Sequence, residues 1–75
     1  MLVKLGARGI KARWVDVKSL RDASDFCTTF IRANDLGASD WRGGEVTENG
    51  EVIAKISYNG RAWKPGPFPQ PEIKM

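Results

Sequence analysis

The feature that most constrains this chain is a pair of Asn-Gly dipeptides, Asn49-Gly50 and Asn59-Gly60, separated by a run of strand-forming residues. An Asn-Gly dipeptide between such runs is the strongest short-range signal for a β-hairpin, because both residues tolerate the positive φ angles that tight turns need. Two such turns predict a three-stranded antiparallel meander in the C-terminal half of the chain.

The length of the loop at each turn decides which side chains share a face of the meander. At the first turn, a two-residue loop would place Glu48 directly opposite Glu51, and like charges in that position destabilise a hairpin. We therefore expect a three-residue loop with a glycine bulge, which sets Val46 opposite Val52.

The second turn is expected to be a two-residue loop that sets Tyr58 opposite Arg61 and Ile56 opposite Trp63. Together the two registers predict one face that packs on a helix and one face that is solvated. The expected buried members are Val46, Val52, Ala54, Ile56, Tyr58 and Trp63. The expected solvated members are Glu45, Thr47, Glu51, Ile53, Lys55, Ser57, Ala62 and Lys64.

The N-terminal half predicts a strand or hairpin followed by one helix. Residues 2–5 can be extended, residues 6–9 can turn, and residues 10–16 alternate with the period of a half-buried strand. Ser19 is typical of a helix N-cap and Gly37 of a helix end, so we expect a helix over residues 19–36. Its apolar stripe consists of Leu20, Ala23, Cys27, Phe30, Ile31 and Asn34, with Phe26 at its edge.

Proline occupies every second position from Pro65 to Pro71 and disfavours both helix formation and pairing in a sheet. We therefore expect a single domain over residues 1–66 and an extended Pro-rich tail over residues 67–75. The predicted fold class is α+β, with one helix packed on a small antiparallel sheet.

The composition argues against most catalytic and metal chemistry. With no His and a single Cys among 75 residues, the chain lacks the usual ligands of a zinc site and cannot pair Ser or Cys with a His base. We expect no enzyme activity, no cofactor and no metal. Cys27 lies on the apolar helix stripe and is expected to be a buried hydrophobe rather than a reactive thiol. A lone Cys cannot form an intramolecular disulfide, which favours the cytoplasm, and we expect no segment that crosses a membrane.

The formal net charge of +3 conceals two opposed zones. Residues 1–21 carry a net charge of +5, residues 22–51 carry −5 and residues 52–75 carry +3. If the strand at residues 10–16 lies beside the last strand of the meander, one basic patch on the solvated face could bind nucleic acid. Its members would be Lys11, Arg13, Lys55 and Lys64.

A plainer interpretation is that these cations solvate the sheet and discourage pairing at its edge. Sheet surfaces that bind single strands need exposed aromatic rings, and the expected register buries Tyr58 and Trp63. This register therefore favours the plainer interpretation.

Trp41, Arg42 and Phe68 are candidates for contact with a partner. Trp41 and Arg42 precede two glycines in an expected loop, and Trp and Arg are common at binding hot spots. The alternative is that Trp41 folds back over the end of the helix and closes the core. Phe68 belongs to the tail, which is suited to lying across a neighbouring molecule.

Two segments carry a resemblance: ANDLGASDWRGGEV at residues 33–46 and IAKISYNGRAWKPG at residues 53–66. They resemble a group of small uncharacterised proteobacterial proteins encoded on chromosomes, plasmids and prophages. The shared parts are residues 36–39, Trp41 and residues 57–63. The group has no established activity, so the resemblance implies a mobile-element or accessory context and identifies no catalytic or binding residue.

The leading expectation is a non-catalytic accessory or protein-interaction domain of bacterial or mobile-element origin. Its partner would be another protein or a second copy of this chain, because the opposed charge zones could pair between subunits. The alternative is a nucleic-acid-binding accessory factor that uses the basic sheet face.

Overall fold

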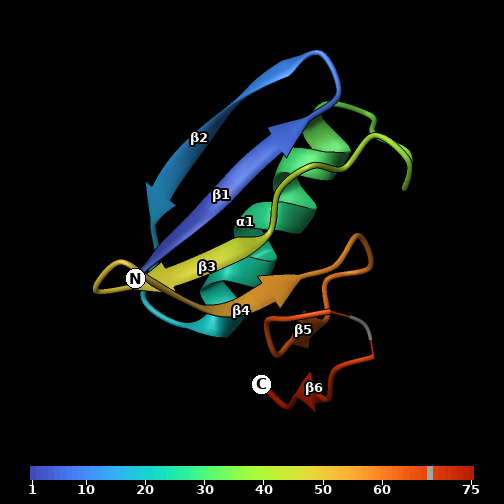
Figure 1. Ribbon diagram of the computed structural model, residues 1–75. Helices are drawn as coiled ribbons and strands as arrows, with labels where there is room; N and C mark the ends of the chain where they lie inside the picture. Colours follow the sequence, from blue (N-terminus) through green and yellow to red (C-terminus); the bar gives the residue numbers. More distant parts are fainter. Residues whose placement is uncertain (68) are drawn as a thin grey trace.

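The computed structural model describes residues 1–67 and 69–75 (Figure 1). Within these ranges the chain forms one helix, α1 (Leu20–Ala33), and a six-stranded antiparallel sheet. The strands are β1 (Leu2–Ala7), β2 (Ile10–Asp16), β3 (Glu45–Glu48), β4 (Glu51–Ile56), β5 (Ala62–Trp63) and β6 (Glu72–Ile73). Figure 1 shows α1 lying across one face of the sheet, which leaves the other face open. The predicted α+β class is confirmed.

The first strand lies inside the sheet, because β1 pairs with β2 on one side and with β3 on the other. The strand order is β2-β1-β3-β4-β5-β6, so β2 forms one edge. The predicted basic patch required residues 10–16 to lie beside the last strand of the meander, and that placement is wrong. The physical reason is burial: Val3 and Leu5 of β1 are buried, whereas residues 11–14 of β2 are exposed. The more apolar strand of the hairpin takes the inner position.

The core lies between α1 and the sheet. From α1 it takes Ala23, Cys27 and Ile31, which belong to the predicted apolar stripe, while Phe26 at the edge of that stripe is exposed. The cluster of buried apolar residues comprises Val3, Leu5, Val17, Ala23, Cys27, Val46, Ala54, Ile56 and Ala62. Their burial is the main favourable contribution to folding.

Local capping fixes both ends of α1. The hydroxyl of Ser19 accepts a hydrogen bond from the Asp22 N–H at 3.1 Å, as predicted for an N-cap. The C-terminus differs from the prediction, because the residue with left-handed backbone is Asp35, at φ 52°, and not Gly37. The Leu36 N–H donates to the carbonyl of Ile31 at 3.0 Å. The helix therefore ends at Ala33, earlier than expected, because Asp tolerates the left-handed conformation well enough to close it.

The first Asn-Gly turn is a two-residue loop, so the predicted three-residue loop is wrong. Glu48 lies opposite Glu51, and the irregularity in pairing lies within the strands, next to Val46, which pairs with Ala54 instead of Val52. Both turn residues have positive φ, as the tight hairpin turn requires. The two carboxylates are exposed to water, which weakens their repulsion, and the favourable turn geometry therefore prevails.

The second Asn-Gly turn is a three-residue loop, residues 58–60, where a two-residue loop was predicted. The Ser57 N–H donates to the carbonyl of Arg61 at 2.8 Å. Ile56 then pairs with Ala62, and Trp63 pairs with Lys55 on the open face. Ala62 is completely buried, a position under α1 where an indole ring is too large. The predicted burial of Tyr58 and Trp63 in the helix-packed face is therefore wrong.

The end of the chain returns to the sheet. Ile73 pairs with Ala62, and the Lys64 N–H donates to the carbonyl of Pro71 at 3.0 Å. The four prolines all precede β6, so its residues keep their N–H donors. The prediction that this segment stays out of the sheet is wrong for residues 72–73. Phe68, the predicted contact residue of the tail, lies outside the described residues.

Cys27 is enclosed in the core and forms no disulfide. Burial, with a smaller contribution from the negative charge of Glu45, raises the pKa of its thiol from 9.0 to about 12. Because the thiolate is the reactive form, this thiol is inert near neutral pH. The expectation of a buried hydrophobe at this position is confirmed by its burial.

We expect Gly44→Ala to be much more destabilising than Gly50→Ala. Gly44 has φ 102°, its N–H donates to the carbonyl of Lys4 at 2.8 Å, and its carbonyl accepts from the Ile56 N–H at 2.8 Å. A Cβ at Gly44 would collide with the carbonyl oxygen of Ile56, whereas a Cβ at Gly50, where φ is also positive, meets nothing within 4 Å. We expect losses in unfolding free energy of about 1–2 kcal/mol at Gly50 and about 3–5 kcal/mol at Gly44. Urea denaturation measures both, and equal losses would contradict the prediction.

We expect Cys27→Ala to flatten the decline of stability at alkaline pH. A raised pKa means that the folded state holds the thiol proton more tightly than the unfolded state. This contribution is therefore fully present below the unfolded pKa of 9.0 and is lost as pH rises toward about 12. Its slope is at most about 1.4 kcal/mol per pH unit. Urea denaturation of both proteins across this range isolates the thiol, because every other titrating group is shared. Parallel pH profiles would rule the effect out.

Candidate functional site

The open face of the sheet carries a row of polar and aromatic side chains. Glu45 of β3 pairs with Lys55 of β4, which pairs with Trp63 of β5, and Trp63 pairs with Glu72 of β6. Directly opposed residues on neighbouring antiparallel strands lie on the same face. Trp63 belongs to this row because the loop at the second Asn-Gly turn has three residues, which sets Trp63 opposite Lys55.

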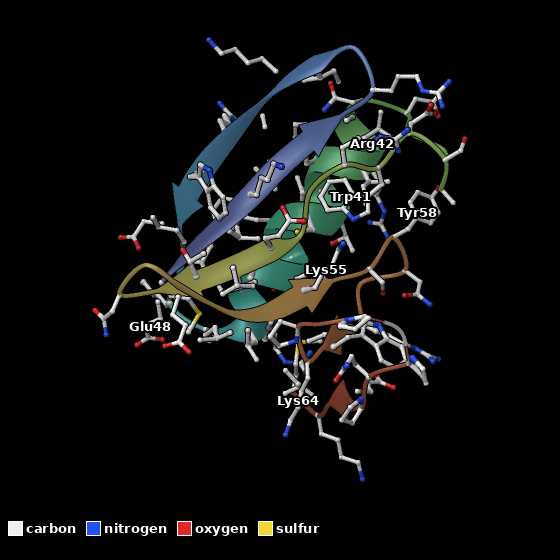
Figure 2. The ribbon with its side chains drawn as sticks, viewed as in Figure 1. Trp41, Arg42, Glu48, Lys55, Tyr58 and Lys64 are labelled. Carbon is white, nitrogen blue, oxygen red and sulfur yellow. The ribbon has the colours of Figure 1, made fainter. Side chains whose placement is uncertain are left out.

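Part of the open face is hollowed into a groove of about 860 Å³. One side is formed by the loop before β3, another by the turn between β4 and β5, and a third by the segment that follows β5. The aromatic and cationic side chains that line it are Trp41, Arg42, Lys55, Tyr58, Trp63 and Lys64. Figure 2 shows Trp41, Arg42 and Tyr58 grouped at one end, with Lys55 on β4 and Lys64 beyond β5. The volume falls in the range of small-ligand pockets.

Trp41 belongs to the core and to the groove at once. Its ring packs against Phe30 of α1, with the ring centroids 6.1 Å apart and the planes at 53°. Its indole N–H donates to the carbonyl of Ile56 at 3.2 Å, which fixes the ring on the sheet. Both sequence interpretations of Trp41 are therefore compatible with its position, because the ring covers part of α1 and also lines the groove.

Tyr58 and Trp63 are the groove residues that the sequence predictions missed. The Tyr58 hydroxyl donates to the carbonyl of Leu36 at 2.8 Å, and 39% of Tyr58 remains exposed. The half-buried Trp63 donates its indole N–H to the hydroxyl of Ser57 at 3.3 Å. The sequence contained a signal for this arrangement: Ala62 is small enough to lie beneath a helix, and burying it places the adjacent Trp63 on the opposite face of the sheet.

The charges in the groove are unbalanced in favour of cations. Glu45 is the only carboxylate that lines it among the described residues, and the Lys55 ammonium lies 3.8 Å from one of its oxygens. The ammonium of Lys4 lies 3.5 Å from the other oxygen. Lys55 keeps 62% of its side chain exposed. The Arg42 guanidinium donates to the carbonyl of Ser39 at 2.6 Å, which holds its charge beside Trp41.

The predicted site residues divide into two groups. Trp41 and Arg42, predicted as contact residues, meet Lys55 and Lys64, predicted as part of the basic patch, around one groove. The other members of the patch, Lys11 and Arg13, lie on β2, which β1 and β3 separate from β4. Arg13 also pairs with the buried Leu5, which directs it toward the helix side of the sheet. The structure thus does not join all the predicted cations into one patch.

Within residues 1–67 and 69–75, no cluster of three Asp, Glu, Cys or His side chains forms a metal-binding arrangement. In the same part of the chain, no helix has the length and apolar character needed to span a bilayer. Chemically, the groove offers aromatic surfaces for planar groups and cations for anionic groups. Comparisons of the chain with family models, curated proteins and solved structures found no match.

Proposed function

We propose that this chain is a non-catalytic accessory domain that binds single-stranded nucleic acid in the groove. The observation that carries the proposal is the convergence of aromatic rings and cations on one open hollow of the sheet. Aromatic side chains stack on exposed bases of any sequence, and cations beside them contact the phosphates. Trp41, Tyr58 and Trp63 supply the rings, and Arg42, Lys55 and Lys64 supply the charges.

The main objection to nucleic-acid binding came from the expected register, which buried the aromatic side chains. With Trp63 opposite Lys55 and Tyr58 partly exposed, that objection no longer applies. An open antiparallel sheet face with aromatic residues is a common platform for single-stranded RNA. The corrected register therefore favours nucleic acid as the occupant of this groove.

A single strand fits the groove better than a duplex does. Readers of duplex DNA commonly insert a helix into the major groove and neutralise phosphates along it. The outward residues of α1 mix Arg21 and Arg32 with Asp25, so the helix has no basic face for that role. The groove, by contrast, offers rings that can stack only on bases released from a duplex.

The accessory role and the bacterial origin rest on the resemblance of residues 33–46 and 53–66 to small proteobacterial proteins. We place the protein in the cytoplasm, where a lone buried Cys27 is the expected state. An accessory role and a cytoplasmic location are both compatible with a domain that binds nucleic acid together with other proteins.

We expect labelled oligothymidylate and oligouridylate to bind at low salt and to be released as salt rises. If Arg42, Lys55 and Lys64 each neutralise one phosphate, the logarithm of the binding constant should fall with the logarithm of salt with a slope of about −2. Fluorescence anisotropy measures this slope. Absence of binding to either strand at low salt would overturn the proposal.

We expect Trp63→Ala to weaken binding by about 1–3 kcal/mol, because one stacking surface is lost. Trp63→Phe should restore most of the affinity, since it keeps an aromatic face.

The double variant Lys55→Gln/Lys64→Gln should weaken binding and reduce the salt slope. Its matched control is Lys11→Gln/Arg13→Gln, which removes the same charge from β2. Equal effects of the two double variants would indicate non-specific attraction and contradict a groove site.

A further inference from the structure

The outer edge of β2 is a second surface at which backbone hydrogen-bonding groups have no partner strand among the described residues. Within the described residues, β2 pairs only with β1, so the outer edge of a seven-residue strand has no partner strand. Figure 1 shows β2 as the outermost strand, with no element alongside its outer edge. The outward-facing backbone groups of such an edge are free to pair with another extended chain.

The charges on this edge are positive and unbalanced. Lys11 and Arg13 on β2, and Arg8 in the turn before it, are exposed, and none of them forms an ion pair with a described carboxylate. Asp16, at the end of β2, lies 3.7 Å from the N-terminal ammonium of Met1 and is partly neutralised by it. The edge therefore presents cations without counterions beside free backbone donors and acceptors.

We propose that this edge binds an extended acidic segment of a protein partner, which adds to the sheet as a seventh strand beside β2. The backbone would supply hydrogen bonds of the kind that join strands, and Lys11 and Arg13 would select carboxylates in the partner. Trp14, on the open face opposite Lys4 and 46% exposed, offers an apolar contact at the same edge. This surface is separate from the groove.

Charge distinguishes the acidic strand from a second copy of this chain. Two β2 edges brought together would place Lys11 and Arg13 of one copy near the same cations of the other. Like charges near one another across paired strands are unfavourable, and basic residues on edge strands generally prevent self-pairing. The feature that repels a second copy attracts a carboxylate-bearing strand.

The test uses the full chain and two synthetic seven-residue peptides, one alternating Glu with Val and one alternating Lys with Val. Amide hydrogen exchange followed by NMR reports which backbone groups become protected. We expect the acidic peptide at millimolar concentration to slow exchange at alternate amides of residues 11–16 by about tenfold. The basic peptide should have no effect.

The variant Lys11→Glu/Arg13→Glu should lose this protection from the acidic peptide and gain it from the basic peptide. Lys55→Glu/Lys64→Glu, the matched change in the groove, should leave it intact. The proposal is overturned if the acidic peptide gives no protection, or if protection appears only around Lys55 and Trp63. It is also overturned if oligouridylate protects the same β2 amides, because the edge would then be a phosphate-binding surface.

Discussion

Two hydrogen bonds hold the turn at residues 58–60 against α1 and the segment that follows it, and the shape of the open face depends on them. The buried Ser24 hydroxyl donates to the carbonyl of Gly60 at 2.7 Å, and the Tyr58 hydroxyl reaches the carbonyl of Leu36. A hydrogen bond that lies partly out of water is costly to leave unmade, so the contact resists other loop lengths. The three-residue loop then places Ala62 beneath the helix and Trp63 on the open face, where the groove forms.

Local signals were enough to predict α1 and the strands from β1 to β5, but not β6. The Asn-Gly turns, the Ser19 cap and the helical spacing that carries Cys27 inward each act within a few residues of the chain. Loop length was not predictable in this way. Ser24 and Gly60 lie 36 residues apart, and the like-charge rule at Glu48 was outweighed by turn geometry. The first effect is a contact between distant segments, whereas the second is a competition between two local preferences, turn geometry and charge repulsion, whose outcome the residue types alone do not decide.

The candidate site was likewise predictable in its residue types but not in how these residues are grouped. Residue type alone identified Trp41 and Lys55, because Trp and basic side chains are common in binding surfaces. Their grouping was not predictable, because the Trp41 indole is held on β4 by a hydrogen bond to the Ile56 carbonyl, 15 residues away, and because the expected strand order placed Lys11 beside the meander. Trp63 was missed because an error of one residue in register moves a side chain to the opposite face.

The inner position of β1 has a consequence for how the chain acquires its fold. Val3 meets Val46 only after a loop containing the whole of α1 has closed, so the central pairing of the sheet is non-local. Closing this loop lowers the chain entropy before the stabilising contacts have formed, which slows folding. During synthesis, β1 leaves the ribosome before β3, so Val3 and Leu5 lack their full covering until β3 has followed. Until that pairing forms, β1 has an unpaired strand edge and exposed apolar side chains, which favour aggregation.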